Sequence, residues 1–202
     1  MQESVFTITP EQGRGLLQLA RKTLMERFGR KLPQAQEAEI GTQLNDPALQ
    51  TVCGTFVTLK MDDQLRGCIG SLVGREPLVD GVKTHAVNAA FHDPRFPSLS
   101  SEEFDRVSIE VSVLSNPEPL EYADAADLLS KLRPHVDGVT IRSGHNSATF
   151  LPQVWDQLSD PQSFLTHLCL KAGLKASAWR DERLHVEIYQ VQYFEESPEK
   201  GN

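Results

Sequence analysis

The sequence predicts an α+β fold of mainly antiparallel sheets with flanking helices. Two hairpin-like pairs of strand segments indicate antiparallel neighbours, because a short turn cannot connect parallel strands. Helical segments are interspersed irregularly and no fixed repeat is visible, which favours α+β over a doubly wound parallel sheet. The stretch 116–119 reads Asn-Pro-Glu-Pro and is the best candidate for a joint. We therefore expect a single domain over 1–202, with a larger and a smaller lobe around a cleft.

The first helix is expected to begin at Pro10 and to end at Gly29. Thr9 can cap its first turn, and Gln12 completes a capping box. A glycine directly after the last apolar residue is typical of a helix end. Residues 30–45 show neither helical nor strand periodicity, so we expect them to wander across the surface as an irregular segment.

The later elements follow from alternation of period two in strands and from apolar residues at helical spacing in helices. We expect strands at 51–60, 65–72, 107–113, 138–141, 148–151 and 184–194. Helices are expected from Pro77 to Asp93, from Asp124 through Leu132 and from Asp160 to Gly173. A short turn capped by Ser100 or Ser101 precedes the strand at 107–113.

Composition narrows the class of protein. The net charge is −8, which argues against nucleic acid as a partner, since a phosphate-backbone binder needs a basic stripe. No apolar run approaches a membrane span, and the first ten residues do not resemble a secretory signal. The three cysteines have no CxxC spacing, which fits a reducing cytoplasm. The sequence thus indicates a cytoplasmic enzyme or binding protein without a membrane association.

The most informative stretch, residues 65–70, reads Leu-Arg-Gly-Cys-Ile-Gly. On an extended strand, Arg66 and Cys68 are expected on the same face because side chains alternate. A neighbouring guanidinium favours the thiolate form of cysteine. Gly67 and Gly70 carry no side chain, so another backbone or a ligand can approach closely. The alternative is that Cys68 is a small buried hydrophobe and that the glycines mark a bulge.

These residues suggest a cleft enzyme. Cys68 would be the nucleophile or attachment point, activated by Arg66, and Arg95 would hold an anionic group of the substrate. Glu110, on the polar side of its strand, would act as a base or orient an arginine. His85 and His92 are weaker candidates for the base, because histidines on exposed helix faces are common.

A structural interpretation explains the same residues. Asp93 would pair with Arg95 and lock the loop after its helix, while Arg66 would form a buried pair with Glu110. The motif would then specify the fold, and any function would lie elsewhere. A metal site is not expected, since no closely spaced pair of ligands links Cys68 to the histidines.

Five segments in order resemble the AMMECR family. They are the hexapeptide at 65–70, Ala89-Ala90 with Asp93-Pro94-Arg95-Phe96, Glu110 to Leu114, Ala148 to Val154, and the helix from Phe164 to Leu174. The resemblance covers roughly 10–195. It implies an α+β protein of two lobes with a cleft lined by the signature residues. It also implies, in prokaryotes, association with a Memo-type protein and a radical S-adenosylmethionine enzyme, without an assigned reaction.

The sequence thus predicts a ligand-binding pathway partner of those two proteins, with a cleft formed by Cys68 and Arg66. The alternative is an enzyme that uses Cys68 as nucleophile, with Glu110, on a small or peptide-borne anionic substrate. The cofactor, the substrate and the reaction are unknown. The expected ligand-binding residues are Arg66, Gly67, Gly70, Asp93 and Arg95.

Overall fold

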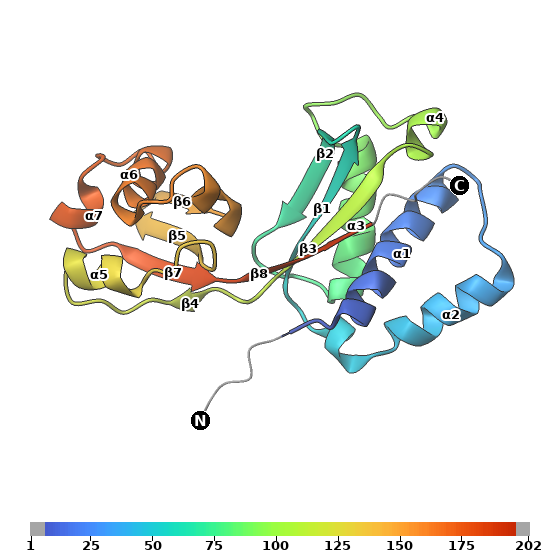
Figure 1. Cartoon of the computed structure of the whole chain (residues 1–202), viewed down its shortest axis with the longest axis horizontal. Helices are drawn as coiled ribbons and strands as arrows, with labels where there is room; N and C mark the ends of the chain where they lie inside the picture. The colour runs from blue at the N-terminus through green and yellow to red at the C-terminus, as the bar shows by residue number, and fades with distance from the viewer. Residues whose placement is uncertain (1–6, 197–202) are drawn as a thin grey trace. The chain divides into compact units, whose positions relative to one another are not determined.

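The computed structural model describes residues 7–196. The chain divides into two compact units (Figure 1). Among the described residues, unit 1 comprises 7–114 and 192–196, and unit 2 comprises 115–191. Each unit contains a four-stranded, mainly antiparallel sheet with helices, which confirms the predicted α+β class. Within the described residues, no helix is long and apolar enough to cross a membrane.

Unit 1 is built on a sheet of strand order β2-β1-β3-β8. Two long helices pack together, one of them over β1 and β2 and the other beside β3 (Figure 1). The elements are α1 (Pro10–Arg27), α2 (Gln34–Leu44), the 3-10 helix η1 (Pro47–Gln50), β1 (Gly54–Met61), β2 (Gln64–Ser71), α3 (Leu78–Phe91), α4 (Ser101–Phe104), β3 (Ser108–Leu114) and β8 (Val191–Glu195).

The two faces of this sheet differ in character. Val57 and Leu59 of β1 and Ile109 of β3 are fully buried, and they belong to the core that includes α1 and α3. Thr58 and Glu110 lie between these residues along their strands, so their side chains point to the opposite face. We call the face that carries Thr58 and Glu110 the outer face. The polar side chains of the outer face therefore come from residues that alternate with the core positions.

The termini of α1 confirm the sequence prediction. Thr9 and Gln12 form the capping box, with Pro10 in the first turn. Gly29 adopts a φ of +70°, a conformation that favours glycine. The prediction of an irregular segment at 30–45 is wrong, because these residues contain α2. All of α2 lies within the described residues, and Ile40 is its one buried residue. The helix therefore has no apolar stripe from which the sequence could have predicted it.

Unit 2 has a sheet of strand order β4-β7-β5-β6. Its core contains Trp155 and Phe164, whose rings stack with centroids 3.6 Å apart. The elements are β4 (Glu118–Pro119), α5 (Ala125–Lys131), β5 (Gly138–Ser143), β6 (Asn146–Phe150), the 3-10 helix η2 (Pro152–Asp156), α6 (Pro161–Lys171), α7 (Ala178–Asp181) and β7 (His185–Tyr189). Asp124 and Asp160 cap α5 and α6, as predicted.

The long final strand predicted at 184–194 is wrong in one respect. It consists of β7 in the sheet of unit 2 and β8 in the sheet of unit 1. Gln190 lies between the two strands, and its N–H and carbonyl are both hydrogen-bonded to Ser115. The pattern of side chains continues through this residue, which explains why periodicity alone did not separate the strands.

Candidate functional site

A β-bulge in β2 determines where Arg66 points. Leu59 pairs with Gly67, whereas its neighbour Lys60 pairs with Leu65, so Arg66 is the extra residue on its strand. Such an insertion interrupts the alternation of side chains. Cys68 pairs with Thr58 and shares the outer face with it, while the insertion directs Arg66 toward the helical side. The prediction that Arg66 and Cys68 share a face is therefore wrong.

The guanidinium of Arg66 is buried and paired with Glu103 of α4. Its Nε and Nη2 donate to the two carboxylate oxygens of Glu103 at 2.9 and 3.0 Å, and Nη2 also donates to the Pro97 carbonyl at 3.0 Å. Arg66 is only 6% exposed. These hydrogen bonds from Arg66, followed by that of the Ser100 backbone, lower the pKa of Glu103 to about 2. The predicted pair of Arg66 with Glu110 is wrong.

Cys68, Thr58 and Glu110 lie in one row across three strands of the outer face. The register pairs Thr58 with Cys68 on one side and with Glu110 on the other. The Thr58 hydroxyl donates to Cys68 Sγ at 3.4 Å. Glu110 accepts a hydrogen bond from Lys60 at 2.9 Å. The thiol is partly exposed, and its hydrogen-bonding neighbour on β1 is a donor rather than a base.

Asp93 and Arg95 hold the peptide groups of Cys68 at the edge of the sheet. Asp93 Oδ2 accepts from the Cys68 N–H at 2.9 Å, and Arg95 Nη2 donates to the Cys68 carbonyl at 3.1 Å. Arg95 also donates to Asp93 from Nε at 2.9 Å and from Nη2 at 2.7 Å. The pair predicted by the structural interpretation is thus confirmed. Its contact with the edge of β2 was not foreseen.

The cation that faces the thiol is Arg95 rather than Arg66. Asp93 is buried, with its side chain 1% exposed, and the Arg95 hydrogen bond holds its pKa well below the usual range. The Arg95 side chain is 53% exposed. Its pKa is raised, first by the hydrogen bond to Asp93 and further by the neighbouring Cys68 side chain. The sequence predicted Arg66 as the guanidinium beside Cys68, whereas Arg95, in the loop after α3, is the arginine that contacts Cys68.

The two glycines of the motif permit close approach within the protein. A Cβ on Gly67 would lie 2.2 Å from the carbonyl oxygen of Ala89 on α3. A Cβ on Gly70 would lie 2.3 Å from the Phe56 ring. The sequence predicted that another backbone or a ligand could approach these glycines, and at Gly67 the backbone of α3 does so. A role of either glycine in ligand binding stays a prediction.

The remaining nucleophile and base candidates lie elsewhere. Cys53 and Cys169 are buried, and burial raises the pKa of both thiols, that of Cys53 to about 11. His92 contacts Asn88 on its own helix. Burial lowers the pKa of His85, although Glu76 acts in the opposite direction. Within residues 7–196, no group of three or more potential ligands could hold a metal ion.

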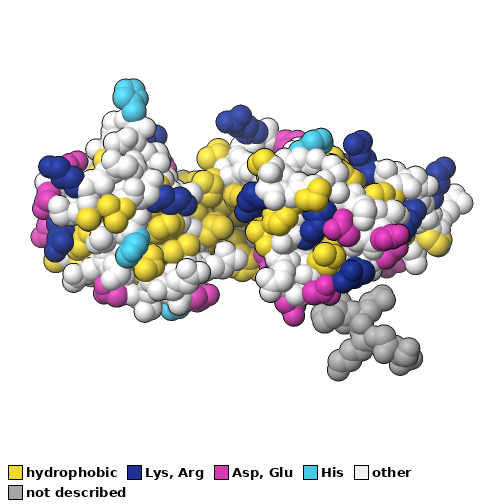
Figure 2. All heavy atoms as spheres, turned by 90° about the horizontal axis from the view of Figure 1, so that it is seen from above, with side chains coloured by type: hydrophobic (Ala, Val, Ile, Leu, Met, Phe, Trp, Pro, Cys, Tyr) yellow, Lys and Arg dark blue, Asp and Glu magenta, His cyan; other side chains and the backbone are white. Residues whose placement is uncertain are grey.

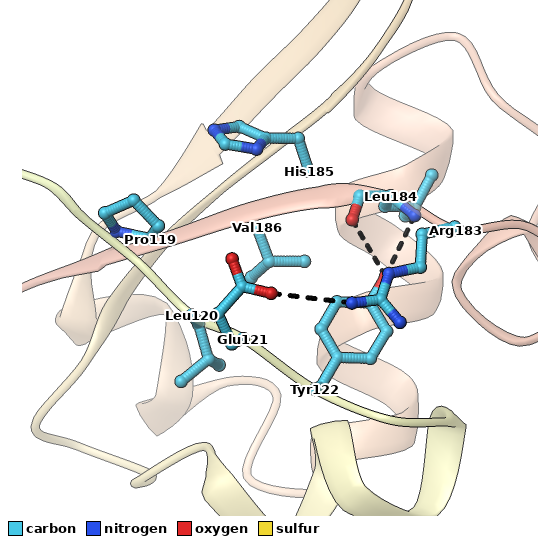
Figure 3. Close-up of a pocket in the computed structure, with 8 residues that line it drawn as sticks. All are labelled: Pro119, Leu120, Glu121, Tyr122, Arg183, Leu184, His185 and Val186. Carbon is cyan, nitrogen blue, oxygen red and sulfur yellow. Dashed lines mark hydrogen bonds and ion pairs between the residues drawn. The ribbon is translucent and has the colours of Figure 1, made fainter.

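Sequence reasoning missed a small pocket in unit 2. Its volume is about 260 Å³, and its lining comes from the segments 119–122 and 183–186 (Figure 3). The Tyr122 hydroxyl exchanges two hydrogen bonds with the backbone of Leu184, each of 2.9 Å, and Arg183 lies 3.5 Å from Glu121. The charged groups of this pocket thus partner one another. No motif in the sequence pointed to it.

A second depression, of about 1180 Å³, lies in unit 1 beside α1 and α2. Its charged groups are mostly engaged: Arg21 pairs with Glu196, and Arg106 donates to Asp62 at 2.7 Å. The described residues that line these two pockets do not include Cys68 or Arg95. Cys68 lies on the edge strand β2 and is partly exposed, and the Arg95 side chain beside it is half-exposed.

Known proteins are similar to this chain over most of its length. A family model described as AMMECR1 matches residues 17–194, a range that includes every residue of the site. The chain belongs to the AMMECR1 family. A protein from Methanothermobacter thermautotrophicus is 37% identical over 190 residues, which are 94% of this chain and 96% of that protein. A protein from Methanopyrus kandleri is 35% identical, over 96% of this chain and 93% of its own length.

A solved structure is also similar to this chain. The crystal structure of an uncharacterized protein from Pyrococcus horikoshii matches with a TM-score of 0.76 and 33% sequence identity, over 96% of each chain. These relatives are similar over almost the whole length of this AMMECR1-family chain. The family and the fold are thereby shown.

Proposed function

We propose that this AMMECR1-family protein binds a small or peptide-borne anionic ligand at Cys68 and Arg95. The observation that carries the proposal is the position of one partly exposed thiol beside one half-exposed guanidinium. Arg95 Nη1 is used neither by Asp93 nor by the Cys68 carbonyl. A guanidinium with free N–H groups is suited to a carboxylate or phosphate.

The charge distribution supports a small anionic group over a polyanion. The site offers one arginine, and its partner Asp93 offsets part of that charge. On the face shown in Figure 2, acidic and basic side chains are interspersed over both units. A nucleic-acid backbone requires many cations in a row, which this site does not supply. The expected ligand therefore carries one or two negative charges.

The alternative function is an enzyme with Cys68 as nucleophile. The Thr58 hydroxyl donates to the Cys68 thiol and Arg95 donates to the Cys68 carbonyl, so the thiol has polar neighbours, which supports this alternative. Glu110, however, is paired with Lys60 and lies two strands away, about 10 Å between backbones at the usual strand spacing. It is therefore poorly placed as a base for Cys68. The geometry favours ligand binding over nucleophilic catalysis.

Selective alkylation tests the pairing of Cys68 with Arg95. We expect iodoacetate and iodoacetamide to modify Cys68 before Cys53 and Cys169, because those two thiols are buried. A cation near the thiol attracts the anionic reagent by about 1 kcal/mol. Arg95→Gln should therefore lower the ratio of the iodoacetate rate to the iodoacetamide rate about fivefold. Peptide mapping by mass spectrometry measures both rates.

The ratio cancels any change in exposure of the thiol that the substitution causes. Arg106→Gln is the matched control, because Arg106 is an exposed arginine of unit 1 paired with Asp62. It should leave the ratio unchanged. An equal ratio in wild type and Arg95→Gln, or equally slow alkylation of all three cysteines, would contradict the proposal.

The proposed partners are a Memo-type protein and a radical S-adenosylmethionine enzyme. The support for them is the resemblance of the sequence to the AMMECR family. If the protein is a ligand-presenting partner, co-purification with both proteins should survive Cys68→Ser, which changes one atom of a partly exposed side chain. Loss of co-purification on that change would instead indicate that the thiol itself holds the assembly. Arg106→Gln again serves as the control.

A further inference from the structure

β2 forms one edge of the sheet in unit 1, and its outward peptide groups are only partly satisfied. The N–H and carbonyl of Cys68 both point away from β1, since Asp93 and Arg95 bond to them at 2.9 and 3.1 Å. These two side chains thus take the place that a neighbouring strand would occupy. They close the edge at this one residue.

Gly70 presents the same orientation two residues further along. In an antiparallel ladder, alternate residues direct both peptide groups to the same side, so the N–H and carbonyl of Gly70 also point outward. Among the residues that the structure describes, neither group has a hydrogen-bond partner outside its strand ladder. Gly70 is partly exposed. Unpaired groups at a sheet edge are a template for one more extended chain.

Arg95 limits how far such a chain can extend. It stands at the Cys68 end of the free edge, so an extended peptide opposite Gly70 meets the guanidinium within about one residue, or 3.4 Å. Further main-chain pairing is blocked there, because Asp93 and Arg95 already occupy the groups of Cys68. A chain that ends at this point places its terminal carboxylate beside Arg95.

We infer that the free edge of β2 binds the C-terminus of an extended peptide, with main-chain hydrogen bonds to Gly70 and the terminal carboxylate on Arg95. The inference rests on the proposed function and specifies its ligand class. The peptide runs antiparallel to β2, and its penultimate residue lies opposite Gly70. The ring of Phe56, which fills the space next to Gly70 on the outer face, provides apolar contact. The thiol of Cys68 then lies next to the terminal residue.

The test is a titration of the ¹⁵N-labelled full chain with the tripeptide Ala-Ala-Ala and with its C-terminal amide. The free acid should shift the Gly70 amide signal and slow its hydrogen exchange. The amide should bind at least about tenfold more weakly, because it lacks the charge that Arg95 recognises. N-methylation of the penultimate alanine should also weaken binding, since it removes a main-chain donor.

Two protein variants complete the test. Arg95→Gln should abolish the preference for the free acid, and Arg106→Gln should leave it intact. Equal binding of the acid and the amide would overturn the inference, as would no Gly70 shift at about 10 mM tripeptide. If the iodoacetate preference at Cys68 persists in that case, the inference fails while the proposed anion site stands. If the preference is also absent, both fail.

Discussion

Replacing Gly67 with alanine is expected to lower the free energy of unfolding of unit 1 by about 3 kcal/mol. The new Cβ would lie 2.2 Å from the carbonyl oxygen of Ala89, and both partners belong to the backbone. Neither can rotate away, so α3 must shift from the sheet. Such overpacking between a helix and a strand also displaces the loop that carries Asp93 and Arg95.

The stability of the Gly67→Ala variant can be measured separately in the two units. Cys53 is buried in unit 1 and Cys169 in unit 2, so pulse alkylation in urea reports the unfolding of each. We expect the midpoint for Cys53 to fall clearly in Gly67→Ala, with a smaller change for Cys169. Gly41→Ala is the control, because a Cβ on this helical glycine meets nothing within 4 Å. It should be neutral or stabilising by about 0.5 kcal/mol. An unchanged midpoint for Cys53 would refute the expected clash.

The sequence predicted the elements whose ends carry local chemistry. Thr9, Asp124 and Asp160 were identified as caps, and Ser100 as one of two candidates with Ser101, because each precedes a helical pattern. The structure shows that the side chains of Thr9, Ser100, Asp124 and Asp160 each accept a hydrogen bond from a backbone N–H three residues later. α2 was missed, since a helix with one buried residue has no apolar stripe. Local signals thus sufficed where the determining contact is local.

The site could be predicted only in part, for a related reason. The pair of Asp93 with Arg95 was predicted correctly, because the two residues lie two positions apart in sequence. The predicted face of Arg66 was wrong, because a single inserted residue in β2 reverses the faces of the side chains that precede it on the strand. Gly67, directly after the insertion, was the available signal for a bulge. The approach of Arg95 to Cys68 depends on how α3 packs, and no sequence pattern encodes that.

Replacing Glu103 with glutamine is expected to destabilise unit 1 by about 2–3 kcal/mol at neutral pH. The substitution keeps the shape of the side chain and removes the charge that partners Arg66. Arg66 is 6% exposed, and its Nη1 already has no partner among the described residues. A buried guanidinium without a counter-charge is costly. Glu103 is itself 27% exposed, which keeps the effect below that of a fully buried pair.

The contribution of this ion pair should depend on pH with a definite sign. The pKa of Glu103 is about 2 in the folded protein and has an ordinary value of 4.5. The unfolded chain therefore binds a proton more readily, so the stabilisation is complete above about pH 4.5 and is lost as the pH falls toward 2. The difference in unfolding free energy between wild type and Glu103→Gln should shrink over that interval.

Urea unfolding followed by far-UV circular dichroism measures this difference at each pH. Fluorescence of Trp155 and Trp179, which both belong to unit 2, reports the other unit separately. Glu102→Gln on the same turn is the control, because Glu102 is an exposed neighbour of Glu103. Equal stability of the two variants would show that the pair contributes nothing. Adding Arg66→Met to Glu103→Gln should recover part of the loss, because it removes the buried charge that the single substitution leaves unpaired.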